Sequence, residues 1–253
     1  MARALLSAIT GCADRLLKTN QFTDWEGAVN GLQVGNRGKV ARIAAAVDGT
    51  LATIRMAITA RADLMIVHHG LFWGTTHPWT GVRYEMLRLL IENDLAIYSS
   101  HLPLDAHPKL GNNARLCAAL GLKKLKPFFL QKGQHIGYRC DTSISRDILV
   151  KRLSVAVGRE PVLLPGGPSR CRKIGVVTGG AGNEVNVAAS EGVDTFITGE
   201  GAHWTFALAE ELGLNVLYGG HYATETFGVK ALAEYLSRKF SLPWVFLDHP
   251  TGL

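Results

Sequence analysis

The stretch Asp63-Leu-Met-Ile-Val-His-His-Gly70 is the part of the chain around which the rest is organised. An apolar run typical of a buried strand ends there in two imidazoles and a glycine. Neighbouring residues on an extended strand point to opposite sides, whereas neighbours in a turn can converge. Because glycine lets the chain turn sharply, we expect Gly70 to direct His68 and His69 toward one site. The stretch predicts a strand over 63–68 that ends in two candidate metal ligands.

Two further stretches have a similar form: Ser100-His-Leu-Pro-Leu-Asp105 and Gly219-Gly-His-Tyr-Ala-Thr-Glu225. His221 and Glu225 are four residues apart at the start of a predicted helix, and this spacing places them on one face. His101 and Asp105 have the same spacing, but Pro103 between them favours a loop. Together the three stretches supply four imidazoles and two carboxylates, which is enough to bind two metal ions.

The composition is that of an ordinary globular protein. The chain has 253 residues, of which 47% are hydrophobic and 19% are charged, so it suits one large domain or two small ones. No apolar run reaches the ~18 residues of a membrane span, and the N-terminus lacks the features of a signal peptide. We therefore expect a cytoplasmic protein that does not bind membranes. None of the four cysteines belongs to a CxxC pair, so we expect reduced, buried thiols.

Strand and helix patterns alternate along the chain, which predicts an α/β fold. We expect strands at 42–48, 63–68, 95–99, 134–141, 161–164, 173–178, 193–198, 214–218 and 244–248. We expect helices at 3–18, 50–61, 81–93, 112–120, 145–157, 183–191, 202–212 and 224–239. The lysine- and proline-containing stretch near residue 122 indicates a crossing into a second unit. We expect one domain over 1–125 plus 220–253 and another over 126–219.

Two features leave alternatives open. The net charge is +6, and basic residues gather in Lys123-Lys-Leu-Lys126 and Arg170-Cys-Arg-Lys173, which would suit nucleotides or nucleic acid. A solvated surface is favoured instead, because no aromatic residues interleave with these clusters. Gly179-Gly-Ala-Gly182 follows a predicted strand and invites a phosphate-loop interpretation. It matches neither GxxxxGK[ST] nor GxGxxG, so a tight strand-to-helix turn is favoured.

Five motifs in order carry a family resemblance: Asn30-Gly-Leu-Gln-Val-Gly35, Val67-His-His-Gly70, Ser100-His-Leu-Pro-Leu-Asp105, Ile197-Thr-Gly-Glu200 and Gly220-His-Tyr-Ala-Thr-Glu225. They resemble the Nif-three-like family, whose members are often named GTP cyclohydrolase 1 type 2 homologues. The resemblance spans nearly the whole chain and matches the short form of the family, which lacks an extra middle domain. The family's second histidine after Gly199-Glu200 is replaced here by Trp204.

The resemblance implies two interlinked three-layer-type α/β domains with a dinuclear metal site in the cleft between them. By position, its ligands would be His68, His69, Asp105, His221 and Glu225. Glu225 would bridge the ions, and His101 would lie at or beside the site. Mixed nitrogen and oxygen ligands suit two divalent ions of Zn, Fe, Mn, Co or Ni. The resemblance also implies a homo-hexameric ring built as a trimer of dimers.

Three functions remain open at this point. The first is a metal-dependent hydrolase acting on a nucleotide or a related phosphorylated or heterocyclic compound, as in purine-ring opening of GTP, with His101 or His203 carrying a proton. The second is a metal-trafficking or scaffold protein without its own catalysis. The third is nucleic-acid binding through the basic face.

Overall fold

The computed structural model describes residues 3–74 and 77–253. The chain forms two compact units. Unit 1 comprises Met1–Leu104 and Gly228–His249, and unit 2 comprises Asp105–Phe227 and Pro250–Leu253. The chain passes from one unit to the other within the short helix α4 (Leu102–Asp105) and the long helix α9 (His221–Phe240). Over the described residues, no helix is both long enough and apolar enough to cross a membrane.

Unit 1 contains a five-stranded sheet in the order β13-β4-β5-β6-β2. The first four strands are parallel, and β2 is an antiparallel edge strand. A separate two-stranded antiparallel sheet pairs β1 with β3. The strands of this unit are β1 (Ala4–Leu5), β2 (Gly31–Val34), β3 (Lys39–Val40), β4 (Ile43–Asp48), β5 (Leu64–His69), β6 (Ala96–Ser99) and β13 (Trp244–Phe246).

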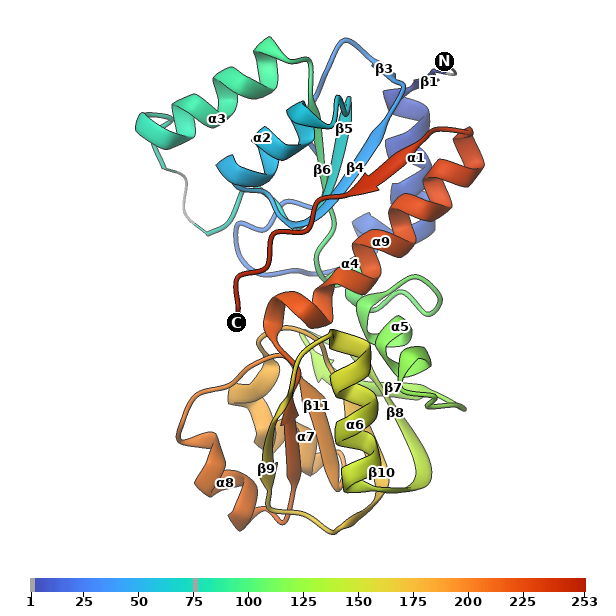
Figure 1. Cartoon of the computed structure of the whole chain (residues 1–253), viewed down its shortest axis with the longest axis vertical. Helices are drawn as coiled ribbons and strands as arrows, with labels where there is room; N and C mark the ends of the chain where they lie inside the picture. Colours follow the sequence, from blue (N-terminus) through green and yellow to red (C-terminus); the bar gives the residue numbers. More distant parts are fainter. Residues whose placement is uncertain (1–2, 75–76) are drawn as a thin grey trace. The chain divides into compact units, whose positions relative to one another are not determined.

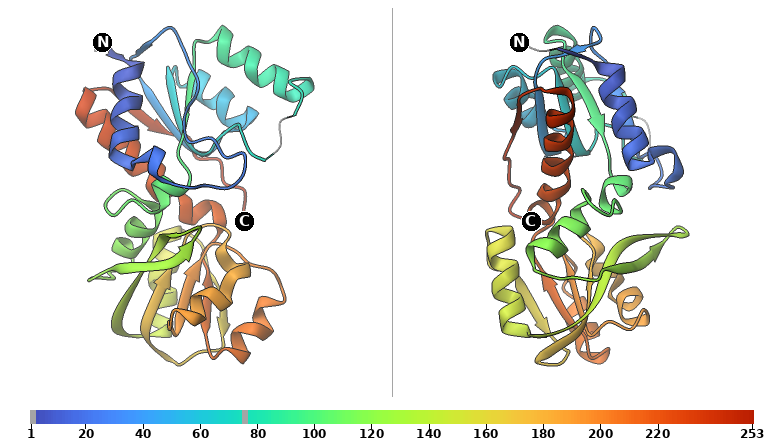
Figure 2. Two further views of the ribbon diagram at one scale, coloured as in Figure 1. Left: turned by 180° about the vertical axis from the view of Figure 1, so that it is seen from behind. Right: turned by 90° about the vertical axis from the view of Figure 1, so that its right-hand side faces the viewer.

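Helices cover both faces of the five-stranded sheet (Figures 1 and 2). On one face, Ala44, Met65 and Ile97 pack against helices α2 (Leu51–Thr59) and α3 (Gly81–Glu92). On the other face lie α1 (Leu6–Leu17), which leads into the 3₁₀ turn η1 (Thr19–Gln21), and the C-terminal part of α9. Burial on both sides explains why β4 and β5 are almost continuously apolar rather than alternating.

Unit 2 contains a six-stranded mixed sheet in the order β7-β8-β10-β11-β12-β9, in which β10, β11 and β12 are parallel. One face packs against α5 and α6, and α7 and α8 lie on the other face (Figures 1 and 2). The strands are β7 (Lys126–Gln131), β8 (Gln134–Ser145), β9 (Val162–Pro165), β10 (Arg170–Val176), β11 (Thr195–Thr198) and β12 (Asn215–Tyr218). The helices are α5 (Asn112–Ala119), α6 (Arg146–Val157), η2 (Ala181–Glu184), α7 (Val185–Ser190) and α8 (Thr205–Glu211).

The predicted α/β class is confirmed, and two local predictions are wrong. In addition, residues 126–131 form the strand β7, which pairs with β8 and was not predicted. Residues 102–105 form a helix because Pro103 lies in its first turn, where a missing N–H costs nothing. Gly70 is not in the left-handed region. A Cβ at this position would lie 2.2 Å from Nε2 of Gln33, so the Gln33 amide would have to move, and both histidines belong to β5.

The boundaries of the two units differ from the division into 1–125 plus 220–253 and 126–219. Helix α5 lies in unit 2 because Leu116, Cys117 and Leu120 pack into the same core as the strands β8 and β10. All four cysteines are free and buried, as the absence of a CxxC pair suggested.

Gly175 provides a test of packing in unit 2. A Cβ at this position of β10 would lie 2.4 Å from the Phe128 ring, which is fully buried. Gly175→Ala is expected to destabilise the protein by about 1–3 kcal/mol through overpacking. Gly35→Ala is the control, because nothing lies within 4 Å of its Cβ. Urea unfolding of both variants checks this, and equal midpoints would contradict it.

Candidate metal centre

Three histidines of unit 1, His68, His69 and His101, form an imidazole cluster. His68 and His69 end β5, and His101 follows the neighbouring parallel strand β6. Their ring centroids are separated by 4.8 Å (His68 to His69), 4.9 Å (His68 to His101) and 5.7 Å (His69 to His101). One nitrogen of each ring lies within 4.8 Å of the other two. The carboxyl ends of adjacent parallel strands meet at one edge, which explains how residues 32 positions apart converge.

An oxygen acceptor faces Nδ1 of every ring in the imidazole cluster. The pairs are His68 with the Ser100 carbonyl oxygen (2.9 Å), His69 with Asp48 Oδ1 (2.7 Å) and His101 with Asp24 Oδ1 (2.8 Å). Because the acceptors are oxygens, Nδ1 carries the proton and Nε2 presents its lone pair. This is the arrangement in which protein imidazoles bind divalent ions, with the acceptor holding the ring orientation.

Asp24 holds His101 through a dense hydrogen-bond network. Its carboxylate accepts hydrogen bonds from His101, the Asn30 side chain and the backbone N–H groups of Trp25 and Leu102. The side-chain oxygen of Asn30 in turn accepts a hydrogen bond from the backbone N–H of His101. Burial raises the pKa of Asp24, but the hydrogen bonds and the charge of His101 outweigh it and lower the pKa to about 2. Asp24 is therefore a fixed anion behind His101.

In unit 2 a second group, the acidic cluster, consists of Glu200, His221 and Glu225. His221 and Glu225 lie on the first turns of α9 with Nε2 3.1 Å from Oε2, as their four-residue spacing predicted. His221 Nδ1 lies 2.7 Å from Glu200 Oε1, so this ring has the same kind of support as the imidazole cluster. Burial lowers the pKa of His221, but its two carboxylate neighbours raise it further, to about 9. The two carboxylates therefore stabilise a positive charge at this point, which the protonated His221 carries.

Asp105 and Glu225 both adjoin the turn after β10. Asp105 Oδ1 accepts a hydrogen bond from Thr178 Oγ1 (3.3 Å) and one from Asn112 Nδ2 (2.8 Å). The next residue, Gly179, has φ +74°, and its Cβ would lie 2.1 Å from Glu225 Oε1. The glycine turn thus packs closely around a carboxylate, which supports the tight-turn interpretation over a phosphate loop.

Five of the seven predicted site residues belong to these two clusters, and a sixth, Asp105, lies in unit 2 beside Thr178. His68, His69 and His101 are in unit 1, and Asp105, His221 and Glu225 are in unit 2. His203 lies apart from the hydrogen-bonded groups, in the exposed segment before α8.

The sequence analysis missed three residues that contact the imidazole cluster. Asp48 could have been found, because it ends the strand beside β5 and is the register partner of His69. Asp24 gives no such signal, since it lies in a segment without regular structure. Trp73 was also missed, and its ring centroid lies 5.7 Å from that of His69 and 4.8 Å from that of His101.

Asp24→Asn is expected to lower the free energy of unfolding by about 2 kcal/mol at pH 7, because the folded state lowers this pKa from 3.8 to about 2. A lowered carboxyl pKa contributes stability that is complete above about pH 4 and is lost as the pH falls through about 2. The difference between parent and variant should therefore shrink below pH 4. Urea unfolding at pH 7 and pH 3 measures it, with the exposed neighbour Glu26→Gln as control. A pH-independent difference would contradict the assignment.

Comparisons with known proteins agree with the motifs and with the fold. The model of the Duf34/NIF3 (NGG1p interacting factor 3) family matches residues 4–251. A Deinococcus radiodurans protein named GTP cyclohydrolase 1 type 2 homolog is 42% identical over 230 residues, covering 89% of this chain and 87% of the relative. A crystal structure of a Thermus thermophilus protein is 38% identical with a TM-score of 0.91, covering 99% of this chain and 100% of that one.

Reduced HcgD from Methanocaldococcus jannaschii is 27% identical with a TM-score of 0.88, covering 98% of this chain and 100% of that one. The resemblance based on five motifs is thus confirmed over the full fold. With a family model that spans nearly all of its residues, the chain belongs to the Duf34/NIF3 family.

Proposed function

We propose that the imidazole cluster and the acidic side chains of unit 2 bind two divalent metal ions. The ligands in this proposal are His68, His69, Asp105, His221 and Glu225, with His101 beside them. The observation that carries it is shared by all four histidines: each has Nδ1 against an oxygen acceptor. At His68, His69 and His101 this leaves Nε2 as the lone-pair nitrogen, as metal binding requires, whereas His221 Nε2 lies against Glu225 Oε2 and would lose its proton when an ion binds.

The donor set fits such ions. Imidazole nitrogens together with carboxylate oxygens suit Zn, Fe, Mn, Co and Ni, and a carboxylate can bridge two of them. Glu225 is 3% exposed, and a buried carboxylate is stable when a cation compensates its charge. Neither unit supplies the full set, since three imidazoles lie in unit 1 and the acidic ligands lie in unit 2.

Metal content tests this directly. Protein purified without chelator is expected to hold two ions per chain by elemental analysis. His69→Ala in unit 1 and Glu225→Gln in unit 2 should each reduce the content below one ion if both units serve the same pair. His135→Ala is the control, because this exposed histidine of β8 lies outside both clusters. Circular dichroism establishes that the variants are folded.

The outcomes separate the alternatives. A parent protein without metal, even after soaking, would contradict the centre. Loss of one ion in each variant, with the other ion retained, would indicate two independent sites and contradict a shared pair.

The reaction that this centre supports best is hydrolysis of a nucleotide or a related phosphorylated or heterocyclic compound. Two divalent ions would polarise a substrate oxygen or phosphate and activate water at neutral pH. His101 has the arrangement of a general base or acid, because Asp24 holds its Nδ1–H and directs Nε2 outward for a proton. His203 is the second candidate, since it is exposed and can exchange protons with solvent. The printed name of the Deinococcus radiodurans relative supports a nucleotide as substrate.

GTP turnover followed by chromatography tests the hydrolase. Glu225→Gln is expected to abolish turnover together with metal binding. His101→Gln should lower kcat by about 10²–10⁴-fold, the usual contribution of a general acid or base, with the metal content retained. His203→Gln reports on the second candidate, and His135→Gln should match the parent. Absence of turnover in the metal-loaded parent, or unchanged turnover in Glu225→Gln, would contradict hydrolysis of GTP.

Metal delivery is the second candidate function. Partial exposure favours it: the side chains of His69 and His221 are 21% and 28% exposed, so an acceptor protein can approach these ligands. Retention of bound metal in the presence of a chelating apo-acceptor would exclude delivery.

Two expectations remain predictions. The homo-hexameric ring rests on the family resemblance. Nucleic-acid binding rests on the basic clusters, and part of that charge is already balanced, because Lys126 Nζ lies 2.7 Å from Asp141 Oδ2.

A further inference from the structure

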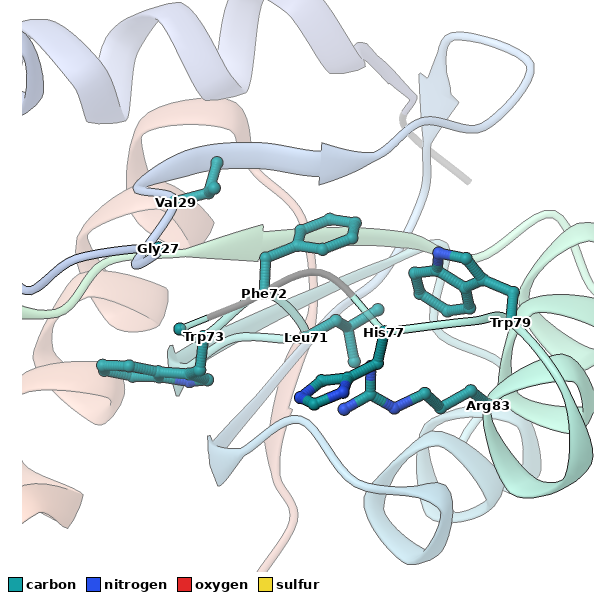
Figure 3. A pocket seen from close by; sticks show the side chains of 9 residues that line it. Gly27, Val29, Leu71, Phe72, Trp73, His77, Trp79 and Arg83 are labelled. Atoms are coloured by element: carbon teal, nitrogen blue, oxygen red, sulfur yellow. The ribbon is translucent and has the colours of Figure 1, made fainter.

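A pocket in unit 1 opens beside the imidazole cluster. Its volume is about 230 Å³, and its walls come from the segment after β5, the start of α3 and the segment before β2 (Figure 3). Volumes of about 300–1,000 Å³ are usual for drug-sized ligands, so this pocket can enclose one fused or single ring. The side chains that line it include Leu71, Phe72, Trp73, His77, Trp79 and Arg83.

The walls combine aromatic surface with one positive charge. Phe72 and Trp79 meet edge to face with ring centroids 5.8 Å apart, and the indole of Trp79 remains 37% exposed. The Arg83 side chain runs from α3 toward the pocket (Figure 3). Within residues 3–74 and 77–253, no carboxylate forms an ion pair with Arg83. An uncompensated guanidinium beside aromatic faces binds an anionic group on a planar ring.

Trp73 connects the pocket to the imidazole cluster. Its side chain lines the pocket, and its ring contacts both His69 and His101. The Trp73 side chain would therefore lie between a ring bound in the pocket and two histidines, the proposed ligand His69 and the proposed proton carrier His101. No wall residue belongs to the proposed ligand set, so the pocket is a separate binding element.

We propose that this pocket binds the planar heterocycle of an anionic substrate, with the ring against Phe72 and Trp79 and the anionic group at Arg83. The inference rests on the proposed function for its choice of a nucleotide as ligand. It adds which residues select the ring and the charge.

Calorimetric titration of the parent protein with guanosine 5′-monophosphate tests the proposal. Arg83→Gln is expected to weaken binding at least about 10-fold, the usual cost of losing a hydrogen bond to a charged group. Trp79→Leu should weaken it by a similar factor through lost stacking. Arg88→Gln, on the same helix but outside the pocket, and Trp204→Leu, in unit 2, are the matched controls and should change affinity less than 2-fold.

Two partial ligands make the assignment specific. Guanosine lacks the phosphate, so its affinity should fall in Trp79→Leu and stay unchanged in Arg83→Gln. Ribose 5-phosphate lacks the ring, so it should show the opposite pattern. Equal affinities of all four variants for the nucleotide, or absence of nucleotide binding to the parent, would overturn the proposal.

Metal content, measured on the same samples, distinguishes this proposal from the dinuclear centre. Arg83→Gln and Trp79→Leu should keep the parent's metal content. If the protein holds no metal but its nucleotide affinity falls in the two pocket variants, the result would support the proposed pocket and contradict the dinuclear centre. If two ions are bound and the nucleotide affinity is unchanged in both pocket variants, the result would support the dinuclear centre and contradict the proposed pocket.

Discussion

The hydrogen bond from imidazole Nδ1 to an oxygen acceptor is the interaction on which the candidate site depends. It recurs at His68, His69, His101 and His221, and the acceptors come from four different segments of the chain. At His68, His69 and His101 the bond selects one tautomer and one ring orientation and presents Nε2, whereas at His221 it fixes the orientation of a ring whose Nε2 also faces Glu225 Oε2. The conformational entropy of these rings is therefore lost during folding rather than during ligand binding.

Two glycines near these histidines have polar side chains packed closely against them. Gly70 makes room for the Gln33 amide, which also accepts the backbone N–H of Leu71 and so fixes the exit from β5. Gly179 leaves space for the Glu225 carboxylate beside the turn that follows β10. At both positions a Cβ would displace the polar end of a neighbouring side chain. Of these two glycines, Gly179 is the one with a positive φ, so the conformational freedom of glycine matters there and not at Gly70.

The parallel sheet of unit 1 explains how the imidazole cluster and the pocket come to be neighbours. The strands β4, β5 and β6 end at one edge, where they deliver Asp48, His69 and the segment that contains His101. The chain that leaves β5 then supplies Trp73, whose ring contacts two of these histidines and also lines the pocket. The proposed metal ligands and the proposed ring pocket thus come from consecutive parts of one strand exit, the usual place for ligands in open α/β sheets.

The α/β alternation, the strands that end in His68, His69 and His101, and the His221–Glu225 spacing were all readable from the sequence, because strand and helix periodicity are local properties. Tertiary structure alone decided which oxygen faces each imidazole, since Asp24 and Asp48 come from segments distant in the sequence. It also decided that the Gln33 amide packs against Gly70, that residues 126–131 pair as a strand, and that Trp73 and Arg83 share a pocket. Such features depend on side chains that meet only after the sheets have formed, and no local pattern encodes those contacts.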